Sequence, residues 1–424
     1  MDYLIKGDLV FTTTYDTITA LEDHVLHIRE GRIFKLYREI PAEYSNLPLE
    51  DHTGRLIIPG FTDLHLHAVQ FVNRGLGLDK ELLDWLNVYT FPEEANFKDL
   101  EYADGVFKSL IKALWSCGTL HSAVYSSLHR DATGHLLELF IQSGLNAYVG
   151  KVNMDRNSGP ALTETWEASL EATRELIDKY GGRSDLVKPI ITPRFAPSCT
   201  PELLTGLGDL AREYGLPVQS HLNETPSEIK WVKRLFPDSA NYLDAYRSHG
   251  LVIPHRTIMA HCVYNQPEEV AAFAAESIFL AHCPTSNLNL ASGIMEAAGL
   301  LRTGSIKLGL GSDIAAGDSL FIPAVMRSAI QSSKLLKFLG KATAPLTLAE
   351  AFYLGTKGGG EFFGPTGSFE EGYWADLLVL EDSANTAFRP LSPIERLEKI
   401  IYTGDDRNIL IRKIRGATVP CPFE

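Results

Sequence analysis

From Pro59 onward, short apolar runs rich in β-branched residues alternate with longer segments whose apolar residues recur at helical spacing. Residues 165–180 and 201–215 are two such helical segments. The alternation predicts βα units around a parallel sheet, in the α/β class. Eight units within about 300 residues fit a (β/α)8 TIM-like barrel. The eight apolar runs cover residues 60–67, 118–127, 146–155, 187–197, 216–224, 257–263, 277–286 and 306–313.

Both ends of the chain carry a different pattern, in which short alternating runs are separated by Gly and Asp. We therefore expect residues 1–57 and 364–424 to form one small β-sandwich domain, and residues 58–363 to form the catalytic barrel domain. Between the eighth run and this tail, residues 346–360 predict a helix that begins with a capping box and ends at three glycines. The strands expected at the two ends cover residues 3–11, 24–30, 31–39, 374–381 and 408–416.

Composition narrows the class of protein. Hydrophobic residues make up 45% and charged residues 22% of the 424 residues, as in ordinary globular enzymes. The formal net charge of −14 argues against a nucleic-acid partner, because an acidic surface repels phosphates. No apolar run is long enough to span a membrane, and the N-terminus lacks the pattern of a signal peptide. The five cysteines are scattered without a C-x-x-C pair, which favours reduced thiols and a cytoplasmic location.

Two histidines stand one residue apart in GFTDLHLH (60–67). Since side chains alternate along a strand, Asp63, His65 and His67 are expected on one face, with Leu64 and Leu66 toward the covering helices. The carboxyl ends of barrel strands are where barrel enzymes place their active sites. Two bare imidazoles buried there would be costly, and a metal ion would remove that cost.

Later strand ends carry the same kind of residue. His221, His261 and His282 end the fifth, sixth and seventh predicted strands, and Asp313 ends the eighth. Several imidazoles with a carboxylate suit Zn²⁺, with Fe²⁺ as the second choice. The end of the fourth strand offers no bridging ligand, so one metal ion is expected.

Glu224 follows His221 by three residues but does not share a helix with it. Thr225, Pro226 and Glu228 have the pattern of an N-cap, first turn and capping box. His221 is therefore expected at a strand end, and Glu224 in the loop just before a helix. Cys262 and Cys283 are expected to be ordinary buried thiols.

The stretches PGFTDLHLH, SHLNE, MAHC, AHCPTSNLNL and GLGSD resemble the metal-dependent amidohydrolases. Within that superfamily the chain resembles the guanine deaminases over nearly its whole length. The more specific matches are HAVQ, DWLNVYTFPEE, KPIITPRFAPSC and TGDDRNI. The strand-end motifs alone would indicate only the superfamily, and these additional stretches narrow the resemblance to the guanine deaminases.

This resemblance implies one zinc ion, a purine substrate and a homodimer. It implies metal ligation by His65, His67, His221 and Asp313. It implies a purine site lined by Gln70, Arg194, Phe195 and His261, with catalytic roles for Glu224, Asp313 and His261. Trp85 is either a wall of the purine site or a core residue, and these two interpretations carry equal weight. The roles of His129 and His282 stay open.

The implied reaction is the hydrolysis of guanine to xanthine and ammonia. Water activated at the metal attacks C2, Asp313 accepts its proton, and Glu224 protonates N3 of the ring. Arg194 only donates hydrogen bonds and therefore binds acceptors such as O6. The amide of Gln70 can donate to a lone pair or accept from an N–H group.

Two rival functions stay open at this point. The first is a deaminase or chlorohydrolase of another aminopurine, a pterin or a triazine, which would share the metal site. The second is a non-catalytic barrel that serves as an interaction scaffold. Such a scaffold usually loses metal ligands, whereas this sequence keeps all of them together with Glu224.

Overall fold

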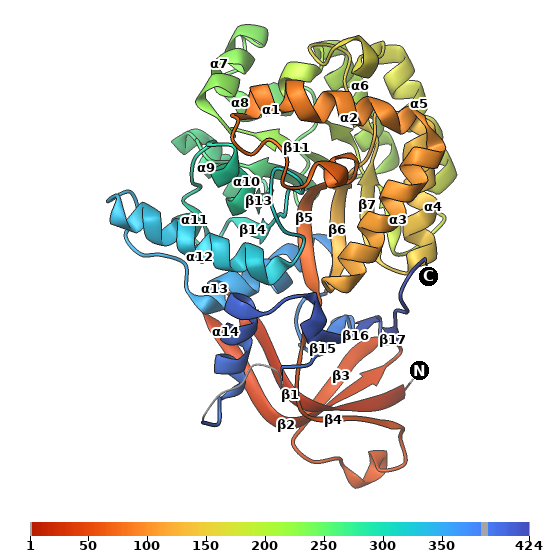
Figure 1. Ribbon diagram of the computed structural model, residues 1–424, viewed down its shortest axis with the longest axis vertical. Coiled ribbons are helices and arrows are strands. Elements are labelled where there is room, and N and C mark those ends of the chain that lie inside the picture. The colour runs from red at the N-terminus through yellow and green to blue at the C-terminus, as the bar shows by residue number, and fades with distance from the viewer. Residues whose placement is uncertain (1, 383–388, 424) are drawn as a thin grey trace.

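Figure 1 shows the computed structural model, which describes residues 2–382 and 389–423. Helices and parallel strands fill its upper part, and a sheet made from both ends of the chain lies below them. Residues 1, 383–388 and 424 lie outside the described residues, although the expected domain segments 1–57 and 364–424 include them.

All eight predicted apolar runs contain strands, and these form two four-stranded parallel sheets and one short pair. The sheet orders are β5-β6-β7-β9 and β11-β12-β13-β14, and β8 pairs with β10. The bounds are β5 Phe61–His67, β6 Thr119–Tyr125, β7 Asn146–Gly150, β8 Val152–Asn153, β9 Val187–Pro189, β10 Thr192–Pro193, β11 Val218–Leu222, β12 Thr257–His261, β13 Phe279–His282 and β14 Lys307–Leu310.

Hydrogen bonds connect the two four-stranded sheets at both edges. On one side the Gln219 N–H donates to the Ile191 carbonyl over 2.9 Å. On the other side the Asp313 N–H donates to the His65 carbonyl over 2.8 Å. Apolar side chains from opposite sheets, such as Leu64 of β5 and Ile258 of β12, belong to one buried cluster between them. The result is an α/β fold in which both sheets contribute to a shared interior.

Helices connect most of these strands and cover their outer side (Figure 1). Their bounds are α1 Leu82–Trp85, α2 Phe91–Glu94, α3 Leu100–Ser116, α4 Arg130–Ser143, α5 Trp166–Tyr180, α6 Pro201–Tyr214, α7 Pro226–Leu235, α8 Tyr242–Arg247, α9 Pro267–Ala275, α10 Pro284–Asn289, α11 Ala297–Arg302, α12 Ile322–Phe338, α13 Leu348–Tyr353 and α14 Pro393–Thr403. Shorter 3-10 or π turns are η1 Ala42–Tyr44, η2 Ala68–Asn73, η3 Leu86–Thr90, η4 Ala95–Lys98, η5 Pro160–Leu162, η6 Ala196–Ser198, η7 Leu354–Gly358, η8 Glu361–Phe363 and η9 Asp406–Asn408.

Local capping chemistry places the ends of two helices where the sequence predicts them. The Thr225 hydroxyl accepts from the Glu228 N–H at the start of α7, and the Glu228 carboxylate accepts from the Thr225 N–H in return. Thr347 and Glu350 form the same reciprocal pair at the start of α13. The helix predicted over 346–360 is α-helical over Leu348–Tyr353, widens into the π turn η7 at Leu354–Gly358, and is α-helical again at residues 359–360.

Strands from both ends of the chain share one seven-stranded sheet of order β17-β16-β15-β4-β1-β2-β3. The N-terminal strand β4 pairs antiparallel with the C-terminal strand β15. Phe11 and Phe369 meet in the apolar core of this sheet, with ring centroids 5.4 Å apart. The pattern analysis missed β4 as a strand. The bounds are β1 Asp2–Thr14, β2 Thr17–Arg29, β3 Arg32–Tyr37, β4 Leu49–Pro59, β15 Leu377–Leu380, β16 Ile409–Ile414 and β17 Ala417–Thr418.

Strict alternation of faces does not hold along β5. Its pairing with β6 shifts register between Asp63 and Leu66. Leu64 packs in the shared interior with residues of β12 and β13, so the expectation that it faces the covering helices is wrong. Asp63 instead accepts hydrogen bonds from the N–H groups of His65 (3.1 Å) and Ser312 (2.9 Å). Burial raises the pKa of Asp63 to about 7.

Arg412 connects the small sheet to the helical part of the chain. Its buried guanidinium donates to the carbonyls of Trp115 (2.8 Å), Ser116 (2.7 Å) and Ile409 (2.8 Å), and its Cζ lies 4.0 Å from the centre of the Trp115 ring. It thereby adds a charged donor to the Trp115 and Ser116 carbonyls at the C-terminal end of α3.

We expect Arg412→Ala to lower the free energy of unfolding by about 2–4 kcal/mol, because three carbonyls lose their charged donor in a buried place. Denaturant unfolding followed by circular dichroism measures this loss. Arg407→Ala is the matched control, since the Arg407 side chain is 86% exposed, and it should change stability by less than about 0.5 kcal/mol. Equal stability of the two variants would contradict the prediction.

Candidate active site

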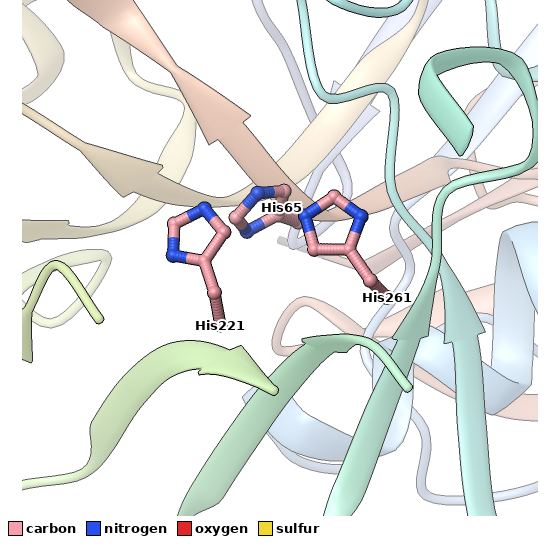
Figure 2. A group of neighbouring side chains, drawn as sticks. All are labelled: His65, His221 and His261. Carbon is pink, nitrogen blue, oxygen red and sulfur yellow. The ribbon is translucent and has the colours of Figure 1, made fainter. Parts of the chain in front are cut away.

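Histidines from three strands and a following aspartate meet at the carboxyl ends of the sheets. His65 and His67 belong to β5, His221 to β11 and His261 to β12, while Asp313 follows β14. Figure 2 shows the rings of His65, His221 and His261 turned toward one another from these separate elements. Each of the sets His65, His221, His261 and His65, His67, Asp313 has ligand atoms within 4.8 Å of one another.

The distances within this cluster suit a shared cation. Nε2 of His67 lies 3.1 Å from Nε2 of His221, and Nε2 of His65 lies 3.4 Å from Oδ1 of Asp313. Both ring nitrogens of His65 are buried without a hydrogen-bond partner among the described residues. Leaving buried polar nitrogens unpaired is costly, and a metal ion bound at their lone pairs removes that cost. The donor set present therefore fits a metal ion.

Partners outside the cluster orient two of the imidazoles. Nδ1 of His221 lies 2.5 Å from the Arg194 carbonyl, and Nδ1 of His261 lies 2.9 Å from Oδ1 of Asn287. Since each Nδ1–H faces an acceptor, each Nε2 keeps its lone pair for the cluster. Burial, together with the charge of His65, lowers the pKa of His67 and His221 well below the ordinary value. Both rings are consequently neutral, as metal ligation requires.

Glu224 is held rigidly beside the cluster. The Ser292 hydroxyl donates to its Oε1 over 2.8 Å, and its Oε2 lies 3.6 Å from Nε2 of His261. Its backbone N–H donates to Glu228 (3.0 Å), whose other oxygen accepts from the Tyr242 hydroxyl (2.7 Å). Burial raises the pKa of Glu224 and raises that of Glu228 to about 7. Burial opposes the charge of His261, but the carboxylates of Glu224 and Asp313 outweigh it and raise the pKa of His261.

A pocket adjoins this cluster and combines its polar groups with an apolar wall. Gln70 and Arg194 line it on the polar side, and both are buried. Of the residues to which the sequence assigned a role, the pocket lining includes all except His65, which belongs to the neighbouring cluster. The lining residues are His67, Gln70, Leu82, Trp85, Leu86, Arg194, Phe195, His221, Glu224, His261, Leu290, Asp313 and Ala316.

Trp85 fits both interpretations left open by the sequence. Its ring lines the pocket, and it is also buried in a cluster with Leu86 and Leu290. The indole N–H donates to the Leu76 carbonyl over 2.9 Å, which fixes the ring in the segment that covers the pocket. His129 and His282 do not line the pocket. Burial lowers the pKa of His282 to about 3.

Sequence reasoning missed three residues that hold the site. Glu94 binds both Arg194 and Gln70, Ser292 donates to Glu224, and Asn287 accepts from His261. Glu94 ends the stretch DWLNVYTFPEE, and Asn287 lies in AHCPTSNLNL, so both were within recognised motifs but not at strand ends. Ser292 carried no signal of its own.

The sequence and the fold are similar to those of known proteins. The amidohydrolase family matches residues 56–419. The chain is 40% identical to the guanine deaminase of Dictyostelium discoideum, over 86% of this chain and 83% of that protein. It is 38% identical to a probable guanine deaminase of Schizosaccharomyces pombe, over 98% of this chain and 78% of that protein. A crystal structure of guanine deaminase from C. acetobutylicum with bound guanine matches with a TM-score of 0.96, 46% identity, and coverage of 99% and 100%.

The family match covers the whole strand-end cluster and the pocket beside it, and the curated relatives are similar over most of their own length. The chain therefore belongs to the amidohydrolase family, and within it to the guanine deaminases.

Proposed function

We propose that this enzyme hydrolyses guanine with one water to xanthine and ammonia. The observation that carries the proposal is a pocket in which a buried guanidinium and a buried amide face the same space as the histidine, aspartate and glutamate cluster. The relatives named above are guanine deaminases, and one of them was crystallised with guanine. A scaffold without activity would need none of these buried polar groups.

The pocket's own groups would hold the base. Arg194 donates a hydrogen bond to O6 of guanine, and the amide of Gln70 forms a hydrogen bond with a neighbouring ring atom. Phe195 and Trp85 supply the aromatic walls along the flat faces of the purine. Adenine carries an amine in place of O6 and would leave Arg194 without an acceptor in a dry pocket.

We assign metal ligation to His65, His67, His221 and Asp313, with one Zn²⁺ per chain and Fe²⁺ as the second choice. When bound, the metal would lower the pKa of a water molecule and so supply a nucleophile at neutral pH. The position of His261 supports its place outside the ligand set, because its Nδ1 is held by Asn287 and its Nε2 lies near Oε2 of Glu224.

Three side chains would then transfer protons or orient the water during the attack on C2 of guanine. Asp313 takes the proton that the water loses when its oxygen bonds to C2. Because Oε1 of Glu224 is occupied by Ser292, Oε2 is the atom that protonates N3. As the C2 hydroxyl becomes a C=O group, Oε2 takes up its proton and gives it to the departing ammonia, and the proton held by Asp313 then restores Glu224. The raised pKa of Glu224 supports this role, since an acid must hold its proton near neutral pH. His261 orients the attacking water.

We infer that the eight parallel strands close into a (β/α)8 barrel, with a small β-sandwich from residues 1–57 and 364–424 and the catalytic domain at 58–363. Hydrogen bonds at both joins between the sheets support the closure. No helix of the described residues is long and apolar enough to cross a membrane. The homodimer and the cytoplasmic location stay predictions, and sedimentation and cell fractionation would test them.

The direct test is incubation of the metal-loaded protein with guanine, followed by ultraviolet spectra and an ammonia assay. We expect xanthine and ammonia in equal amounts, and no ammonia from adenine. A panel of other aminopurines, pterins and triazines runs beside it. Turnover of a panel member but not of guanine would overturn the substrate assignment and keep the family.

Glu224→Gln removes the proton donor while it preserves size and the hydrogen bond from Ser292. We expect ammonia release from guanine to fall by about 10³-fold or more, with the bound metal retained. Steady-state kinetics and metal analysis measure the two effects. Near-normal turnover would exclude Glu224 from the proton transfers.

Removal of the metal should abolish activity and lower the melting temperature, because the buried imidazoles lose their partner. Dialysis against a chelator, then addition of one equivalent of Zn²⁺ or Fe²⁺, tests this by calorimetry and activity. We expect recovery to saturate at one ion per chain. Full activity of a metal-free preparation would refute the assignment, and saturation at two ions would refute a single-metal site.

A further inference from the structure

Glu94 lies outside the pocket lining and binds Gln70 and Arg194, the two polar residues that we assign to the base. It ends helix α2 and is 4% exposed. Its Oε2 accepts from Nη1 of Arg194 over 2.5 Å, and its Oε1 accepts from Nη2 over 3.0 Å. The same Oε1 accepts from Nε2 of Gln70 over 3.2 Å. Glu94 is not among the pocket-lining residues, so it acts on a ligand only through these two neighbours.

The first consequence concerns charge. The Arg194 side chain is 4% exposed, and an unpaired guanidinium at that depth would be strongly unfavourable. The two-point contact with Glu94 supplies the compensating charge in the geometry that arginine and carboxylate groups prefer. Arg194 therefore offers its remaining N–H groups from a neutral pair, and the pocket gains hydrogen-bond donors without a net positive charge.

The second consequence concerns the orientation of the Gln70 amide. If the amide were turned over, Oε1 would face the Glu94 carboxylate at about the present 3.2 Å, and two acceptors would repel each other. Glu94 thus fixes Nε2 on its own side. Oε1 of Gln70 then lies on the other side of the amide group and accepts no hydrogen bond from the described residues.

We propose that Glu94 is a positioning residue that makes the purine subsite neutral and presents an acceptor on Gln70 beside donors on Arg194. This pattern complements a neutral lactam edge, a ring N–H next to a C=O, which guanine offers at N1 and C6. The inference rests on the proposed function. It explains how the site would select the neutral lactam form of the base over its anion and over bases that lack the ring N–H and C=O.

Two other bases show what this arrangement rejects. Xanthine, the product, loses a proton more readily than guanine, and its anion gains nothing from a neutral subsite. 2-Aminopurine has no O6, and its N1 carries a lone pair that would oppose Oε1 of Gln70. Glu94 should therefore weaken the binding of both, and in the case of xanthine it should ease product release.

The test is Glu94→Gln, with Glu93→Gln as the matched control on the same helix. Glu93 binds the hydroxyl of Tyr102, away from the pocket. The measurements are the KM and kcat for guanine and the inhibition constants of xanthine and 2-aminopurine, across the pH range in which xanthine ionises. Circular dichroism and metal content confirm that each variant is folded and loaded.

For Glu94→Gln we expect the KM for guanine to rise about tenfold or more, with a smaller change in kcat. The inhibition constant of xanthine should fall about tenfold where the anion dominates, because Arg194 is now uncompensated. The inhibition constant of 2-aminopurine should also fall, since the Gln70 amide is free to turn. Glu93→Gln should leave all three values within about twofold.

A weakening of all three ligands in the same proportion would show a merely structural role and overturn the proposal, as would unchanged constants in a folded variant. If Glu94→Gln does not fold, Glu94→Asp tests the proposal instead. This variant keeps the negative charge beside Arg194 but shortens the side chain that contacts Arg194 and Gln70. Weaker guanine binding with xanthine inhibition unchanged supports the proposal, and tighter xanthine binding overturns it. Failure of the unmodified enzyme to release ammonia from guanine would instead remove the proposed function.

Discussion

Hydrogen bonds between β5 and the loop after β14 are the constraint on which the site depends. The Asp63 carboxylate holds the Ser312 N–H, and the His65 carbonyl holds the Asp313 N–H. Residues from the first and last strands of the parallel set thereby come within ligand distance, although about 250 positions of sequence separate them. Without this join, two histidines and the aspartate would belong to separate sheet edges, and no shared position for a cation would exist.

Hydrogen bonds also accompany the buried carboxyl groups in and around the site. Asp63, Glu224, Glu228 and Glu94 are all buried, and each accepts hydrogen bonds from backbone N–H groups or from polar side chains. These hydrogen bonds offset part of the cost of burial and hold the groups in one orientation. Rigid placement of the polar groups is what a site needs in order to discriminate between bases that differ by one proton or one oxygen.

Sequence patterns predicted the parts of this structure that depend on periodicity and local chemistry. The eight strand positions, the strand-end histidines and the capping boxes at Thr225 and Thr347 all follow from short-range rules. The orientation of Leu64 did not follow, because the register shift in β5 arises from pairing with a distant strand. Glu94 and Ser292 were missed for a related reason, since their roles depend on neighbours 100 and 68 residues away along the chain.

The seven-stranded sheet has a consequence for the order in which the chain can fold. Strand β4 receives its antiparallel partner from β15, which is synthesised more than 300 residues later. Until that segment has left the ribosome, one edge of β4 carries unpaired N–H and C=O groups, and edges of this kind recruit other strands. The N-terminal strands thus spend most of synthesis as an incomplete sheet. Protection of the nascent chain by a chaperone would matter most during that interval.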